Sequence, residues 1–110
     1  MRTKQIPKSE WPAFLDSFSR EHEGWLMKLE ILGSEIGAQV METGLSLEGV
    51  TDERDTVVIT AGSAPDDHIT HSIGNPTEVS LEQTDEGADM ALSIKSADGT
   101  TALLSFRATL

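Results

Sequence analysis

The feature that most constrains this chain is a two-residue alternation of apolar and polar side chains from Trp25 onward. Successive residues of a β-strand point to opposite faces, so this period indicates strands with one apolar face and one polar face. Antiparallel sheets with one solvated side have that pattern, whereas buried parallel strands read as continuous apolar runs. The alternating segments are 25–32, 36–41, 57–61, 69–73, 78–82, 89–95 and 101–107.

A different period precedes the strands. One stripe with the i, i+3, i+4, i+7 spacing of a helix face contains Trp11, Phe14, Leu15 and Phe18. We predict a helix over 9–22, with Ser9 as N-cap, although Pro12 also allows a start at Trp11. Gly24 is expected to take the left-handed conformation that ends many helices.

Together these patterns predict an α+β fold. One N-terminal helix packs on a curved antiparallel meander sheet, or partial barrel, of six to eight strands, and residues 1–110 form a single domain. Thr3–Ile6 is expected as a short edge strand. Short turns link neighbouring strands, among them Gly33–Ser34 and Asp98–Gly99, the latter the strongest hairpin signal. Residues 44–55 look polar and broken, and the loop from Gly62 contains Pro65.

Charge and composition exclude several classes of partner. The formal net charge is −11, from 19 acidic and 8 basic residues, and no basic stripe offsets it. Nucleic acid and anionic membranes are therefore not expected as partners. The acidity indicates solubility, with a salt-adapted host or a basic partner as alternatives. The chain has no cysteine, and neither an apolar leader nor a membrane-length run is visible, so a cytoplasmic location is expected.

One segment gathers residues that often bind ligands, namely Asp67, His68 and His71. His71 lies between Ile69 and Ile73 on the predicted apolar face, where it is either a satisfied core residue or a polar group lining a cavity. His68 and His71 are separated by an odd number of residues, so a strand would point them to opposite faces. No metal centre and no cofactor are therefore predicted.

Catalytic motifs are missing from the rest of the chain. No nucleophile elbow, dinucleotide fingerprint, P-loop or calcium loop occurs, and His22 is interpreted as a favourable interaction with the end of the helix dipole. We therefore expect a non-enzymatic interaction or regulatory domain, with a second copy or another protein as partner through free sheet edges. The alternative is a domain that binds a small ligand or metal on the concave sheet face around His71.

Three long segments resemble an uncharacterised bacterial family, a domain of unknown function. They read EWPAFLDSFSREHEGW near the start, PDDHITH in the middle and LEQTDEGADMALSIKSADGTT near the end. The resemblance spans almost the whole chain and implies a small bacterial domain. It carries over no activity, substrate or functional residue.

Overall fold

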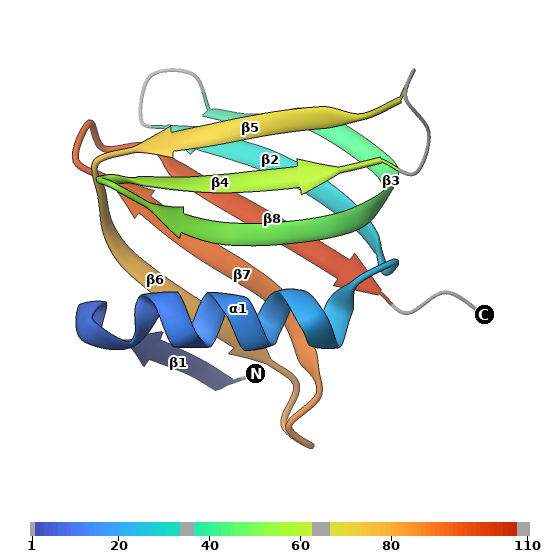
Figure 1. Cartoon of the computed structure of the whole chain (residues 1–110), viewed down its shortest axis with the longest axis horizontal. Helices are drawn as coiled ribbons and strands as arrows, with labels where there is room; N and C mark the ends of the chain where they lie inside the picture. The colour runs from blue at the N-terminus through green and yellow to red at the C-terminus, as the bar shows by residue number, and fades with distance from the viewer. Residues whose placement is uncertain (1, 34–36, 63–66, 108–110) are drawn as a thin grey trace.

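The computed structural model describes residues 2–33, 37–62 and 67–107. Within these ranges the chain forms a 3-10 turn, one α-helix and eight strands (Figure 1). In chain order they are β1 (Arg2–Ile6), η1 (Lys8–Glu10), α1 (Trp11–His22), β2 (Leu26–Gly33), β3 (Gly37–Glu53), β4 (Thr56–Ala61), β5 (Ile69–Gly74), β6 (Pro76–Gln83), β7 (Asp89–Ser96) and β8 (Thr101–Arg107). The predicted turn at Gly33–Ser34 and the loop around Pro65 extend outside the described residues.

The predicted fold class is confirmed. All strand pairs are antiparallel, in the order β1-β6-β7-β8-β2-β3-β4-β5, and the sheet does not close. Two meanders, β2 to β5 and β6 to β8, join where β2 pairs with β8. The predicted edge strand is also present, with β1 along the outer side of β6.

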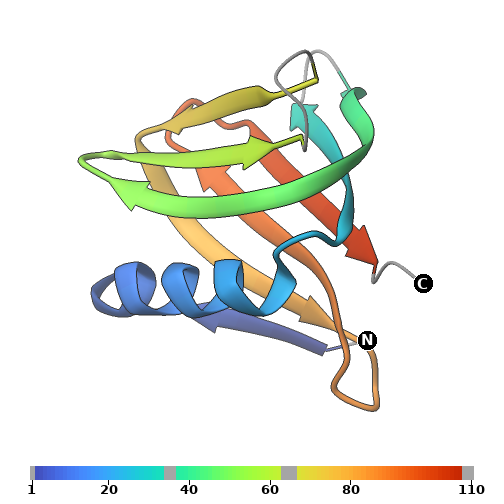
Figure 2. The ribbon, with the colours of Figure 1, turned by 45° about the vertical axis from the view of Figure 1, so that its right-hand side comes forward.

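Strand β3 corrects the expectation that residues 44–55 are broken. It runs for 17 residues, and its first half pairs with β2 whereas its second half, from Leu47, pairs with β4. Register shifts interrupt the β2 pairing, one of them beside Gly44, whose φ is 81°. These irregularities let one strand bend through two layers. Figure 2 shows β3, β4 and β5 folded over the rest of the sheet.

The core lies between these two layers. Its fully buried side chains come from both layers and from α1, and the largest are Leu15, Leu29, Leu47, Ile59, Leu92, Ile94 and Leu104. The alternating residues thus turn one face inward, as their period predicts.

Helix α1 ends where the sequence predicts but starts later than Ser9. Residues Lys8–Glu10 wind into a 3-10 turn, in which the Glu10 N–H donates to the carbonyl of Pro7 at 2.9 Å. Ser9 therefore sits inside a turn, and the α-helix has no side-chain cap. The start falls at Trp11, and Gly24 has the predicted positive φ, 87°. No helix in the described ranges is long and apolar enough to cross a bilayer.

Folding the sheet in two leaves two seams between its layers. The first separates the second half of β3 from β1, and helix α1 lies along it (Figure 1). We call it the covered seam. Ser19 Oγ of α1 lies 2.8 Å from both the backbone nitrogen and the carbonyl oxygen of Val50, and Trp11 Nε1 donates to the carbonyl of Ile6 at 2.9 Å. The helix thereby supplies the hydrogen bonds that a neighbouring strand would otherwise make.

The second seam separates β5 from the first half of β3. In the described residues, β5 pairs only with β4, and Gly37–Ser46 pairs only with β2. No described helix lies along this side of the fold (Figure 1). We call it the open seam.

Candidate functional site

His71 lies at the open seam. As predicted, it shares the inward face of β5 with Ile69 and Ile73, and its cross-strand partner in β4 is the fully buried Ile59. The imidazole is only half-buried, and no described helix or strand covers it on the β3 side. It lines a groove of about 490 Å³ between β5, β2, the first half of β3 and the β7–β8 turn.

Apolar side chains form the floor of this groove. Ile73 and Ala102 are 6% and 3% exposed, and Ile31 packs against the core beside them. Met41, on β3, stands at the mouth and is 47% exposed. A concave apolar floor of this volume is typical of small-molecule sites.

Polar groups occupy the rim. Among them is Asp98 in the β7–β8 turn, whose pKa is shifted by its hydrogen bonds. Its Oδ1 accepts hydrogen bonds from the hydroxyl of Thr100 at 2.6 Å and from the Thr100 N–H at 2.9 Å. The Thr100 hydroxyl, and after it the backbone N–H, lower the pKa of Asp98 below the ordinary aspartate value. Among the described residues, no lysine or arginine lines the groove. The rim is therefore negative at neutral pH.

The other two predicted ligand residues do not join His71. His68 is exposed, and its Nε2 lies 2.9 Å from Oε2 of Glu48 on β3. Asp67 is exposed in the turn before β5. Neither lines the groove. His68 precedes β5 and contacts Glu48, whereas His71 lies within the strand, so the two imidazoles do not share a site.

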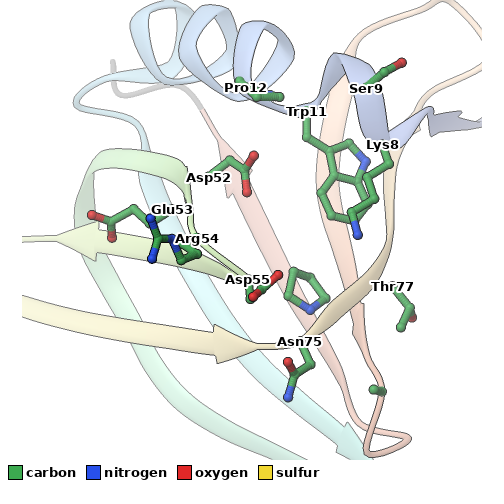
Figure 3. Close-up of a pocket in the computed structure, with 12 residues that line it drawn as sticks. Lys8, Ser9, Trp11, Pro12, Asp52, Glu53, Arg54, Asp55, Asn75 and Thr77 are labelled. Carbon is green, nitrogen blue, oxygen red and sulfur yellow. The ribbon is translucent and has the colours of Figure 1, made fainter.

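A second cleft, of about 480 Å³, opens at the corner beside the start of α1 (Figure 3). Lys8 and Trp11 stand on one side, and Asp52 and Asp55 on the other. Its walls are three turns tied together by their backbones, because the Asn75 N–H donates to the Asp55 carbonyl at 2.8 Å and the Ala97 N–H donates to the Asn75 carbonyl at 3.0 Å. We interpret this cleft as the junction that holds the turns.

A third feature is the environment of His22, whose burial and contact with Asp89 were not predicted from the sequence. His22, in the last turn of α1, is 3% exposed. The rings of Phe18, Trp25 and Phe106 surround its imidazole, with centroids 4.3, 4.6 and 4.7 Å away. Its Nδ1 lies 2.8 Å from the Phe18 carbonyl oxygen, which agrees with the predicted interaction with the helix end. Its Nε2 lies 3.1 Å from Oδ2 of Asp89, at the start of β7.

One signal for His22 was present in the sequence. Trp11, Leu15, Phe18 and His22 follow one another at steps of four, three and four residues, so the apolar stripe of the helix continues to His22. A histidine on such a stripe is expected to be buried, and a buried imidazole needs polar partners. Asp89 has no such signal, because its contact with His22 joins positions 67 residues apart through tertiary packing.

Comparison with known proteins agrees with the resemblance seen in the sequence. A model for a family of unknown function, DUF5335, matches residues 2–110. An uncharacterized protein of Aquifex aeolicus (strain VF5) is 30% identical over 105 residues, which cover 94% of this chain and 91% of that protein. No solved structure matches the chain.

Proposed function

Since the chain belongs to the DUF5335 family, whose function is unknown, we propose a function from geometry alone: a non-enzymatic domain that binds a small molecule in the groove of the open seam. The observation that supports it is the apolar floor around Ile31, Ile73 and Ala102, which lies beside the half-buried His71. Ile31 and Met41 leave apolar surface uncovered in the groove, and the free energy falls when a ligand displaces water from such surface.

The charge of the groove restricts the class of ligand. Asp98 is ionised at neutral pH, and the groove residues that the structure describes include no lysine or arginine. The net charge of −11 adds a long-range field of the same sign. An anionic ligand would be repelled. We therefore expect an apolar body that carries a neutral or cationic hydrogen-bonding group, with His71 as a polar partner.

Two probes of similar size and opposite charge test this proposal. Tryptamine is a cation at neutral pH, and indole-3-acetate is an anion. We expect tryptamine to bind more tightly by at least roughly tenfold, or about 1.4 kcal/mol, in NMR titrations at fixed ionic strength. The amide signals of Ile31, His71 and Ala102 should report the binding.

Three variants test whether the probes bind in the groove. Asp98→Asn should reduce the preference for tryptamine, and Ala102→Phe should fill the floor and abolish the shifts. Thr70→Ala changes an exposed residue on the outward face of β5 and should have no effect. Saturable binding by neither probe, or equal binding by Ala102→Phe, would contradict the proposal.

A second candidate function is self-association. Val40 is 54% exposed on the outer face of β3, opposite Glu30 of β2, whose other neighbour is Leu103 of β8. In the described residues, the edges of β5 and of the first half of β3 that face the open seam have no strand partner. These features support a homodimer, with a second copy of the chain as the partner. Light scattering of wild type and Val40→Lys at equal concentration tests it, and a wild-type monomer at high concentration would exclude it.

The compartment that we propose is the cytoplasm. The chain has no cysteine, so its fold does not depend on an oxidising environment for disulfides. Imaging of a fluorescent fusion in a bacterial host of the family would test this location.

A further inference from the structure

The nature of the contact between His22 and Asp89 depends on which nitrogen of the imidazole carries a proton. A carbonyl oxygen can only accept, so Nδ1 of His22 must carry the proton that it donates to Phe18. In a neutral imidazole the other nitrogen, Nε2, is then a lone-pair acceptor. It faces an oxygen of Asp89 at 3.1 Å, and an ionised carboxylate is also an acceptor. Two acceptors at this distance need a cation between them, either a proton or a metal ion.

The surroundings supply a third ligand. Glu21 lies next to His22 at the end of α1, and one ligand atom each from Glu21, His22 and Asp89 fall within 4.8 Å of one another. In the part of the chain that the structure describes, this is the one group of three ligand-type side chains gathered so closely. Transition metals bind imidazole nitrogen and carboxylate oxygen at about 2.0–2.2 Å. Two such ligands at a tetrahedral angle stand roughly 3.3 Å apart, close to the observed contact.

The groups behind these ligands are arranged as in metal sites. A ligating histidine usually donates its second ring N–H to a carbonyl or carboxylate, and ligating carboxylates are in turn hydrogen-bonded. Here the Phe18 carbonyl holds Nδ1 of His22 at 2.8 Å. The amide nitrogen of Gln83 donates to the second oxygen of Asp89, Oδ1, at 2.9 Å. Each of these two side chains is thus oriented by one hydrogen bond, and its other polar atom is left to bind the cation.

We propose that His22 Nε2, Asp89 Oδ2 and a carboxylate oxygen of Glu21 bind a divalent transition-metal ion of the zinc class. The imidazole favours such a metal over magnesium or calcium. His22 is buried at the bottom, the side chain of Asp89 is 22% exposed, and Glu21 is exposed. The ion therefore enters from the Glu21 side, and water completes its coordination. Bound there, it links the end of α1 to the start of β7.

Zinc titration of the whole chain tests the proposal. We expect one zinc ion per chain by calorimetry and a higher Tm in zinc, because a ligand that binds only the folded state stabilises it. Cobalt serves as a spectroscopic probe, and its visible bands should appear with the same stoichiometry.

The variants are chosen so that the protein still folds. Asp89→Asn can place an amide N–H opposite the Nε2 lone pair, which satisfies His22 without a metal. Glu21→Gln changes an exposed side chain. Each should weaken zinc binding by at least about tenfold, and Gln83→Leu should weaken it by roughly 10–100-fold through the orientation of Asp89.

The matched control is His68→Gln. It removes another imidazole beside a carboxylate, Glu48, at 2.9 Å on the exposed surface, and should leave zinc binding unchanged. Absence of 1:1 binding, or binding that His68→Gln abolishes and Asp89→Asn does not, would overturn the proposal and leave a proton as the cation. Loss in Asp89→Asn with full binding in Glu21→Gln would overturn the three-ligand assignment.

Discussion

The two seams of the folded sheet are closed in different ways. Along the covered seam, the helix contacts β3 and buries Leu15 and Phe18, which are 0% and 2% exposed. Along the open seam, β5 and the first half of β3 face each other without a described element between them, and Met41 is 47% exposed. The same strand, β3, therefore has one half sealed and the other half accessible.

This difference separates stability from binding. The covered seam buries large side chains and satisfies the backbone of an edge strand, which are the contributions that hold a small domain together. The open seam leaves apolar surface and a histidine in contact with solvent, which lowers stability but provides a concave surface for a ligand. Truncating one residue on each seam tests whether the two seams differ in this way.

The largest effect is expected from Phe18→Ala on the covered seam. Phe18 packs edge-on against Phe106 at 5.2 Å between ring centroids and lies beside His22. Its removal leaves a cavity, which should cost about 3–5 kcal/mol in the free energy of unfolding. Met41→Ala, on the open seam, should cost about 0.5 kcal/mol or less, as for other exposed positions. Urea denaturation at 25 °C measures the free energy of unfolding of both variants. Similar losses in the two variants would contradict the difference between the seams.

A smaller effect is expected from Ser19→Ala. The Ser19 hydroxyl accepts from the Val50 N–H and lies 2.8 Å from the carbonyl oxygens of Val50 and Leu15. The backbone groups of Val50 would lose this partner at a part-buried position, at a cost of about 0.5–1.5 kcal/mol. Ser17→Ala, on the exposed face of the same helix, should change stability by about 0.5 kcal/mol or less.

The amide of Val50 gives this prediction a local readout. Hydrogen exchange at that amide should accelerate in Ser19→Ala relative to amides of β8. Unchanged exchange and unchanged unfolding would show that the strand edge is protected by the helix backbone alone.

Much of the fold could be predicted because its periods are local. The stripe from Trp11 to Phe18 and the alternation after Trp25 each follow from how side chains project from a helix or a strand. The strand in residues 44–55 was missed because a bent strand with register shifts changes its inward face partway, which disrupts the alternation. Its path depends on two different partner strands, and sequence order alone does not contain that information.

The candidate site could be predicted only in part. The position of His71 on an apolar face follows from its neighbours Ile69 and Ile73, but the groove beside it exists because no described helix or strand covers that seam. Likewise, the burial of His22 follows from the helix stripe, whereas its partner Asp89 comes from a strand 67 positions later. The local spacing of apolar residues predicts which face of a helix or strand a residue occupies. The packing of segments distant in the sequence determines which residues it contacts there.

The smallest effect is expected at the rim of the open seam, where Asp98 is held by Thr100. Thr100→Val removes the hydroxyl donor, the larger cause of the lowered pKa, and keeps the backbone N–H. The pKa of Asp98 should therefore rise toward the ordinary aspartate value and stay slightly below it. An NMR titration of the side-chain carboxyl carbon measures this shift, with Thr70→Val as a control on the outward face of β5.

The sign of the pH effect follows from this shift. The folded pKa of Asp98 lies below its unfolded value, so its contribution to stability is present above the unfolded pKa and is lost as the pH falls through the folded pKa. Thr100→Val should narrow the range of acidic pH over which this contribution to stability changes. The free energy of unfolding near neutral pH should stay almost unchanged, because the carboxyl is solvent-exposed. If the titration curve of Asp98 does not move in Thr100→Val, the Thr100 hydroxyl is not the cause of its lowered pKa.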